Sequence, residues 1–177
     1  IAADFTSNWI MPTKFLVDYS KTRIPENSWM SKHYQFESVL SLTGANADYR
    51  AQIKPSQEGV IALGILNIIS GKSIGVEVND KLLKLIDNVA NELINAKGES
   101  IVVSGSNNKD IQVLVNAINY KLNNYSSTID LDRPLEVYQG DDKEVENLYN
   151  EAINGKIDAL ISYGVNPVYS LPNGSAF

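Results

Sequence analysis

The stretch KLLKLIDNVANELINAKGESIVVSGSNNKDIQVLVNAINYKL, residues 81–122, decides the fold that the sequence predicts. Its first part carries apolar residues at helical spacing, after the candidate cap Asn79 and before Gly98. A β-branched run follows at residues 101–103, then a loop of Ser, Gly and Asn at 104–107, then a second helical stripe that ends at Leu122. A helix, strand, loop and helix in this order are typical of an α/β protein.

The pattern continues toward the C-terminus. Residues 135–138 predict a strand, and Asp141 can cap a helix that carries Glu144 in its first turn. Residues 157–163 predict a last strand that is nearly continuous in apolar residues, as expected for a parallel strand covered on both faces. Residues 76–177 therefore predict a β-α-β-α-β part. The expected fold is an α/β, three-layer Rossmann-like domain with a mainly parallel sheet.

Residues 1–75 are less regular. They predict short strands at residues 2–5, 34–36 and 49–53, a helix that begins near Pro12, and a helix over residues 56–69. At 177 residues we expect a single α/β domain over residues 1–177. Because the sequence begins at Ile1 without an initiator Met, we also expect that domain to be excised from a longer polypeptide.

Composition excludes several classes of site. The chain has no Cys and one His, so a Cys-ligated metal, an iron-sulfur cluster or a site with several imidazoles has no ligands here. A net charge of -6 and a pI near 4.8 argue against a nucleic-acid partner. The longest apolar run, residues 60–69, is too short to insert into a membrane.

Two loops after predicted strands are the candidate binding site. In a parallel sheet such loops share one edge, where helix N-termini present N–H groups to anions. The simpler interpretation is that the glycines make tight turns and the amides cap helices. The candidate residues for cofactor binding are Gly105, Ser106, Asn107, Gly164, Asn166 and Pro167.

Two other features have simple structural interpretations. His33 can titrate near neutral pH, but no nucleophile accompanies it, which favours a structural or surface histidine over an acid-base catalyst. The acidic group at residues 141–146 fits compensation of a helix dipole better than a metal site. We therefore predict no catalytic residue and no metal ligand in this chain.

A resemblance to a known family is carried by SKHYQFES at residues 31–38 and LTGANADYR at residues 42–50. These segments resemble molybdopterin oxidoreductase-like proteins, and more narrowly the large iron-sulfur, molybdopterin-like subunit of alternative complex III, a quinol-oxidising bacterial respiratory complex. Further segments agree in order and extend the resemblance over most of the chain: ADF at 3–5 with Trp9, KPS at 54–56, VSGSN at 103–107, QGDD at 139–142 and YGVNP at 163–167.

The resemblance implies a domain of a respiratory subunit whose iron-sulfur clusters lie elsewhere in the polypeptide. In family enzymes the loop that corresponds to Gly164, Asn166 and Pro167 lies near a pyranopterin guanine dinucleotide. The alternative complex III branch keeps the fold without the molybdenum cofactor, so no cofactor is expected in this chain. The implied partners are the other subunits of a membrane-bound complex, the iron-sulfur region and a cytochrome, on the periplasmic side of the bacterial inner membrane.

Three hypotheses for function follow. The first is a structural and interaction domain in quinol-linked electron transfer, without bound molybdenum cofactor. The second is part of the cofactor cleft of an active molybdopterin-dependent oxidoreductase. The third, outside the family, is an α/β domain that binds a nucleotide or phosphate at the loops of residues 104–108 and 164–167.

Overall fold

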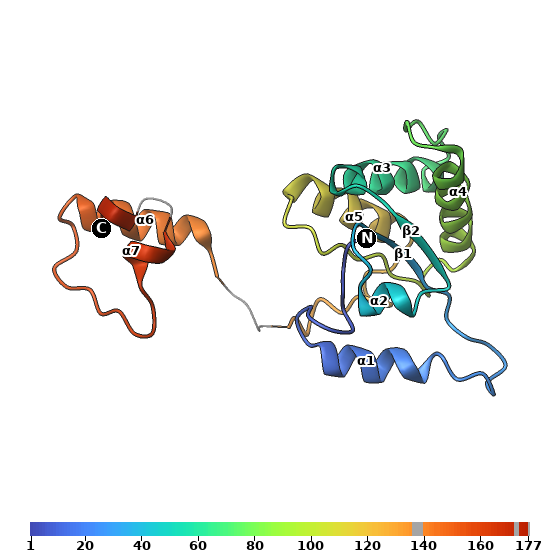
Figure 1. Cartoon of the computed structure of the whole chain (residues 1–177), viewed down its shortest axis with the longest axis horizontal. Coiled ribbons are helices and arrows are strands. Elements are labelled where there is room, and N and C mark those ends of the chain that lie inside the picture. The colour runs from blue at the N-terminus through green and yellow to red at the C-terminus, as the bar shows by residue number, and fades with distance from the viewer. Residues whose placement is uncertain (136–139, 172–173, 177) are drawn as a thin grey trace. The chain divides into compact units, whose positions relative to one another are not determined.

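The structure, a computed structural model, describes residues 1–135, 140–171 and 174–176. The chain divides into two compact units, Ile1–Pro134 and Leu135–Phe177 (Figure 1). The single domain expected over residues 1–177 stays a prediction.

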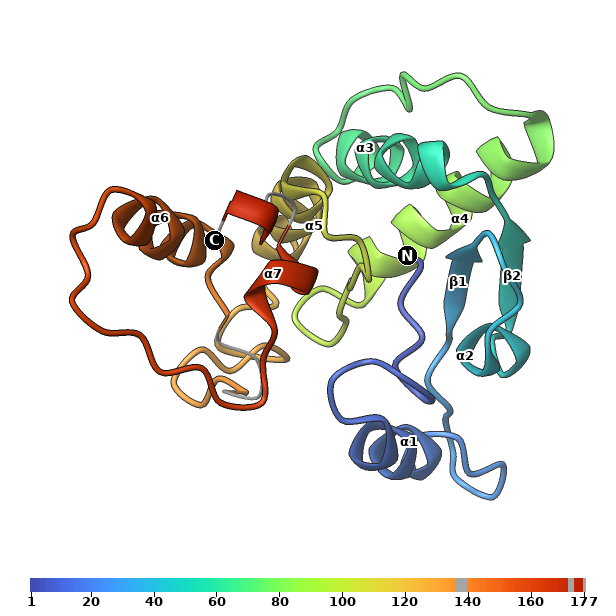
Figure 2. The same cartoon turned by 60° about the vertical axis from the view of Figure 1, so that its left-hand side comes forward.

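The first unit contains a parallel pair of strands with helices around it (Figure 2). Its elements are α1 (Pro12–Lys21), β1 (Tyr34–Glu37), α2 (Leu42–Ala45), β2 (Tyr49–Gln52), the 3-10 turn η1 (Pro55–Gln57), α3 (Glu58–Ile69), α4 (Asp80–Asn95) and α5 (Lys109–Lys121).

Strands β1 and β2 pair in parallel, with Tyr34 opposite Tyr49 and Glu37 opposite Gln52. The chain returns from the end of β1 to the start of β2 through α2, because parallel neighbours need a crossover. Parallel pairing and surrounding helices give a mixed helix and sheet structure, which agrees with the predicted α/β class. The sheet is built from residues 34–52, within the part of the sequence whose pattern is less regular.

The core lies between β1 and the helices α3, α4 and α5. Phe36 of β1, Ile61 and Ile65 of α3, Ile86 of α4 and Ile118 of α5 are almost completely buried in one cluster. Helix α4 begins after Asn79, whose side chain accepts a hydrogen bond from the Leu82 N–H, as predicted. The helices predicted from apolar spacing are thus confirmed, including α1 with Pro12 in its first turn.

The strand predicted at residues 101–103 is wrong, because a side chain occupies the place of a neighbouring strand. Asn119 of α5 donates from Nδ2 to the Val102 carbonyl at 2.7 Å and accepts the Val102 N–H on Oδ1 at 3.0 Å. The Val103 carbonyl instead accepts a hydrogen bond from the Ile1 nitrogen at 2.7 Å. These bonds satisfy the Val102 N–H and the carbonyls of Val102 and Val103, but they do not form a continuous ladder with a neighbouring strand.

The strand predicted over residues 2–5 is also wrong, because a turn begins at Phe5. Only the first two residues make bonds of the kind found in a sheet. The Ala2 N–H donates to the Phe36 carbonyl of β1 at 2.8 Å, and the Ile1 carbonyl accepts the Gly105 N–H at 3.0 Å. This segment therefore joins β1 to the loop that precedes α5.

The second unit contains α6 (Asp142–Ile153), α7 (Pro167–Ser170) and the 3-10 turn η2 (Gly174–Ala176). Asp141 caps α6 by accepting the N–H groups of Lys143 and Glu144, as predicted. The strand predicted over residues 157–163 is wrong: no strand pairs with this segment among the described residues, and the Ile161 and Tyr163 side chains are 93% and 95% exposed. The strand predicted at 135–138 falls mainly on residues outside those described.

Among the helices that the structure describes, none has the length and apolar character needed to cross a membrane.

Candidate functional site

The first predicted loop, residues 104–108, is held by its own side chains. The Ser106 N–H donates to the Ser104 hydroxyl at 3.2 Å, and the Asn108 N–H donates to the Ser106 hydroxyl at the same distance. Gln112 of α5 donates from Nε2 to the carbonyls of Ser104 and Ser106, at 3.1 and 2.6 Å. The structure thus brings Gly105, Ser106 and Asn107 together, with Asn107 exposed.

Gly105 has a packing role. A Cβ atom at this position would lie 2.3 Å from the Ala2 carbonyl oxygen, so only glycine lets the loop approach the N-terminal segment. Its N–H donates to the Ile1 carbonyl at 3.0 Å. The glycine that was predicted to approach a ligand therefore approaches backbone of the same chain.

The second predicted loop, residues 164–167, lies in the other unit and leads into the short helix α7. Gly164 has a φ of +66°, which favours glycine. The Asn166 side chain accepts the Tyr169 N–H at 3.3 Å, and Pro167 is the first residue of α7. Gly164, Asn166 and Pro167 are together, but their convergence with residues 104–108 stays a prediction.

The described residues of the two loops do not fit the phosphates of a dinucleotide in this conformation. The N–H groups of Gly105, Ser106 and Asn108, which would face an anion, already donate to oxygens of the chain. Asn166 uses its side chain as a helix cap, and Pro167 has no N–H. We derive no chemistry through a cofactor here, and the cofactor-binding role of the six predicted residues stays a prediction.

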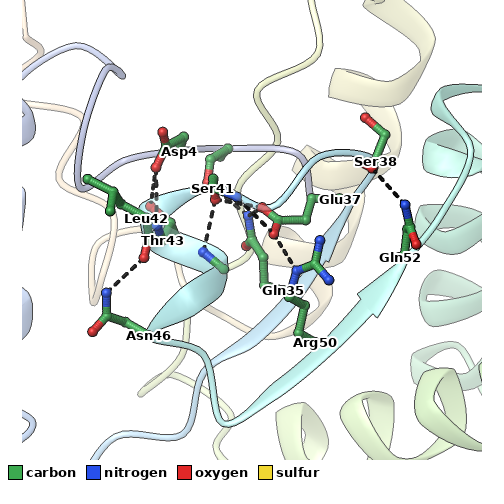
Figure 3. A network of polar contacts seen from close by, with 12 residues as sticks. Asp4, Gln35, Glu37, Ser38, Ser41, Leu42, Thr43, Asn46, Arg50 and Gln52 are labelled. Atoms are coloured by element: carbon green, nitrogen blue, oxygen red, sulfur yellow. Dashed lines mark hydrogen bonds and ion pairs between the residues drawn. The ribbon is translucent and has the colours of Figure 1, made fainter.

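Among the residues that the structure describes, a different polar cluster has the most hydrogen bonds around one side chain, and its centre is Glu37 at the end of β1 (Figure 3). The Glu37 side chain is 5% exposed and forms an ion pair with Arg50 of β2, with 2.6 Å between Arg50 Nε and Glu37 Oε1. It also accepts hydrogen bonds from the Ser41 hydroxyl at 2.6 Å, the Ser41 N–H at 3.2 Å and Gln35 Nε2 at 3.1 Å. Four donors fill the four acceptor positions of the carboxylate.

The same cluster extends to the N-terminal segment through Asp4 and Thr43 (Figure 3). Asp4 Oδ1 accepts the Thr43 hydroxyl at 2.7 Å and the Thr43 N–H at 3.2 Å. The Thr6 and Thr43 hydroxyl oxygens are 2.8 Å apart, and Gln35 Nε2 also donates to the Ala3 carbonyl at 3.1 Å. The network therefore ties residues 3–6 to β1, α2 and β2.

Both carboxylates of the network are held in the charged form. Burial alone raises the pKa of Glu37, but hydrogen bonds from Ser41, Arg50 and Gln35 outweigh it and bring that pKa below its usual 4.5. Burial likewise raises the pKa of Asp4, and hydrogen bonds from Ser7 and Thr43 lower it below the usual 3.8. A saturated, charged Glu37 is suited to hold structure together and has no oxygen left for proton transfer.

Gly44 makes this packing possible. A Cβ atom on Gly44 would lie 1.9 Å from Glu37 Oε1, so the carboxylate rests directly against the backbone of α2. Ser41 caps the same helix, since its hydroxyl oxygen accepts the Gly44 N–H at 2.9 Å. One serine thus serves both the helix and the carboxylate.

A second cluster surrounds His33 at the start of β1. The hydroxyl oxygen of Tyr19 in α1 lies 3.0 Å from His33 Nδ1, and Phe5 packs against both rings. Burial lowers the pKa of His33 below its usual 6.5. Asp48 accepts the His33 N–H at 2.8 Å and pairs with both terminal nitrogens of Arg23, each at 2.7 Å. This environment fits a structural histidine that docks α1.

The described part of the chain contains no group of three His, Cys, Asp or Glu side chains arranged to hold a metal ion. Asp141, Asp142 and Glu144 lie at the N-terminus of α6, where acidic residues complement the helix dipole.

Sequence reasoning from composition and spacing missed the Glu37 network, since its members are separated in the sequence. The available signal was the resemblance, because residues 31–38 and 42–50 contain Gln35, Glu37, Thr43, Gly44 and Arg50. Those segments mark the place of the network without indicating its chemistry.

A scan of the chain against models of known protein families finds no match, and no curated protein matches it either. The family resemblance rests on the quoted residues and continues as a proposal.

Proposed function

We propose that this chain is a molybdopterin oxidoreductase-like domain of a respiratory iron-sulfur subunit, without bound molybdenum cofactor. It acts as a structural and interaction domain in quinol-linked electron transfer. The observation that carries the proposal is the Glu37 network, because the segments that bear the resemblance use their polar side chains to join β1, α2, β2 and the N-terminal segment. Polar side chains that are used in such contacts serve architecture.

The finer fold belongs to the same proposal. A three-layer Rossmann-like domain with a mainly parallel sheet needs parallel strands and helices packed against them. The parallel register of β1 and β2, and the burial of Phe36 in one cluster with residues of α3, α4 and α5, support it. In this proposal the two strands described belong to such a sheet.

The proposed partners follow from the resemblance. They are the other subunits of a membrane-associated complex, the iron-sulfur region of the same polypeptide and a cytochrome, on the periplasmic side of the bacterial inner membrane. The net charge of -6 supports docking against a basic surface, since complementary charge guides association.

The decisive experiment measures molybdenum, iron and released-pterin fluorescence on the full-length polypeptide purified from its native host. The proposal expects iron and acid-labile sulfide without stoichiometric molybdenum or pterin. Stoichiometric pterin would overturn it and favour the cofactor-cleft hypothesis.

The phosphate-site hypothesis is tested separately on the chain itself. Thermal unfolding is followed with GDP, ATP and inorganic phosphate, each added in excess. A ligand that binds the folded state raises the midpoint with concentration. We expect no shift, because the N–H groups of residues 105, 106 and 108 are already bonded within the chain. A saturable shift that is lost in Ser106→Pro would support phosphate binding instead.

A further inference from the structure

A cavity of about 260 Å³ lies between β1 and residues 101–103. Its walls are mainly apolar and come from β1, α3, α4 and the segment before α5. The apolar side chains that matter here are Phe36, Ile65, Val89, Leu93, Ile101 and Val103. An apolar cavity beside a strand raises the question of what kind of chain would fill it.

Ile1 lines this cavity, and Ile1 and Ala2 bond to both of its walls. The Ile1 nitrogen donates to the Val103 carbonyl at 2.7 Å, and the Ile1 carbonyl accepts the Gly105 N–H at 3.0 Å. This pair of bonds is the repeat of a parallel ladder, with Ile1 opposite Ser104. On the other side the Ala2 N–H donates to the Phe36 carbonyl at 2.8 Å. The two walls are therefore spaced to accept one strand, about 10 Å apart.

The backbone of both walls faces the cavity. In a parallel ladder, alternate residues direct both N–H and C=O to the same side. The carbonyls of His33 and Glu37 accept the N–H groups of Tyr49 and Ile53 on the β2 side. The backbone N–H and C=O groups of the alternate residues, Tyr34 and Phe36, therefore face the cavity. On the opposite wall, Asn119 occupies the N–H and C=O of Val102, which leaves the backbone groups of its neighbours 101 and 103 on the cavity side.

The cavity continues to the surface. A second hollow of about 470 Å³ shares Ser31, Lys32, Tyr34, Val89, Leu93 and Ile101 with the first. It is bordered by Trp29, which is 63% exposed, and by residues 99–101. The two hollows are neighbours, because they share these residues, and both include Tyr34 of β1; we call the two together the β1 groove.

We propose that the β1 groove holds an additional parallel β-strand, formed by an extended apolar segment of the natural polypeptide that leads directly into Ile1. The register set by Ile1 and Ala2 places its last three residues opposite Gln35, Tyr34 and His33. The strand order becomes β2, β1, the added strand, then residues 101–103. The inference stands on these bonds and cavities and does not depend on the proposed function.

Apolar character follows from the two faces of the groove. The side chains of a strand alternate between its two faces, and the lining that they would meet includes Ile65, Val89 and Leu93 of α3 and α4 together with Phe5 and Tyr19. An apolar side chain on either face removes hydrocarbon surface from water, which stabilises the fold.

The test compares two extended forms of the chain. Both carry the same Met-Ser-Gly leader, followed by Val-Ile-Val before Ile1 in one and by Gly-Ser-Gly in the other. We expect the Val-Ile-Val form to have a higher urea midpoint and amide exchange at Tyr34, Phe36 and Val103 slowed roughly tenfold or more. Equal midpoints and equal exchange would overturn the proposal.

A groove variant separates strand binding from a general effect of apolar residues. Ile101 is 52% exposed, so Ile101→Lys should change the Gly-Ser-Gly form little. In the Val-Ile-Val form the same change should remove most of the gain, because it places a charge against the added strand. A gain that persists in Ile101→Lys, or that appears only with dimers in gel filtration, would contradict the assignment. A separate apolar peptide could also bind the groove in a saturable way. If it does so while the Val-Ile-Val extension does not raise the urea midpoint, the occupant is not the segment that leads into Ile1.

Discussion

The two compact units of this chain treat apolar residues differently. All the buried hydrophobic side chains among the described residues lie within Ile1–Pro134, whereas α6 and α7 of the second unit bury none. Ile61 is 0% exposed in α3, and Ile161 is 93% exposed in the segment predicted as a strand. Apolar sequence alone does not produce a core. An apolar segment is buried only where another element packs against it, as α4 and α5 pack against α3.

The largest expected effect tests this contrast with one substitution at two places. Ile61→Ala should lower the free energy of unfolding by about 2–5 kcal/mol, because it removes buried methyl groups and leaves a cavity. Ile161→Ala should change it by less than about 0.5 kcal/mol, since the side chain is exposed. Urea unfolding followed by circular dichroism measures both. A large loss from Ile161→Ala would show that the second unit also buries its apolar residues.

The next effect concerns the Glu37 network. Glu37→Gln should cost about 1.5–3 kcal/mol, the range for hydrogen bonds to a charged group. The matched change Glu92→Gln breaks the exposed ion pair with Lys32 and should cost about 0–1 kcal/mol.

The pH dependence of the same pair of variants gives a further check. The pKa of Glu37 is lower in the folded protein than its usual 4.5, so its contribution is complete above pH 4.5 and is lost as the pH falls below that value. In Glu37→Gln that part of the acid sensitivity should be absent. If the free energy of unfolding of Glu37→Gln falls with pH below 4.5 as steeply as that of the wild type, the charged Glu37 is not the source of this acid sensitivity.

A third prediction concerns backbone packing. Gly44→Ala should destabilise by about 1–3 kcal/mol, because the new methyl group collides with the Glu37 carboxylate. Gly140→Ala is the control, since no atom of the residues that the structure describes lies within 4 Å of its added Cβ. Thermal unfolding of the two variants measures the difference. Equal midpoints would show that the carboxylate can move aside at little cost.

The smallest effect is expected at His33. Because burial lowers its pKa below 6.5, the neutral form is favoured in the folded protein. Its contribution is therefore complete above pH 6.5 and declines as the pH falls through that value. A comparison of the wild type with His33→Gln between pH 7.5 and 5.5, by urea unfolding, should show this slope only in the wild type. The same slope in both would exclude His33 as its source.

The helices were predictable from the sequence because their contacts are local. Apolar spacing and caps such as Asn79, Asn108 and Asp141 locate α4, α5 and α6 closely. Strands depend on partners distant in the sequence. Residues 101–103 have the composition of a strand, yet Asn119 and Ile1 take their hydrogen bonds.

The candidate site was less predictable for the same reason. The sequence draws attention to Gly105 and Asn166 as residues near a ligand, and the structure shows their local roles in close packing and capping. The contact of Glu37 with Gly44 and Arg50 depends on how α2 folds back beside β1, which no local pattern records. The family resemblance pointed to residues 31–38 and 42–50, and the structure shows that their polar side chains hold the fold together.

The side chain of Asn119 has one more consequence. By binding both backbone groups of Val102, it blocks the outer edge of that segment against any strand from another molecule. Asn124 donates from Nδ2 to Asn119 Oδ1 at 2.9 Å and holds the blocking amide in place. An open sheet edge is a risk for aggregation, and here a single buried amide acts as a gatekeeper against it. Pairing of another strand with Val102 should therefore be prevented for as long as that amide stays in place.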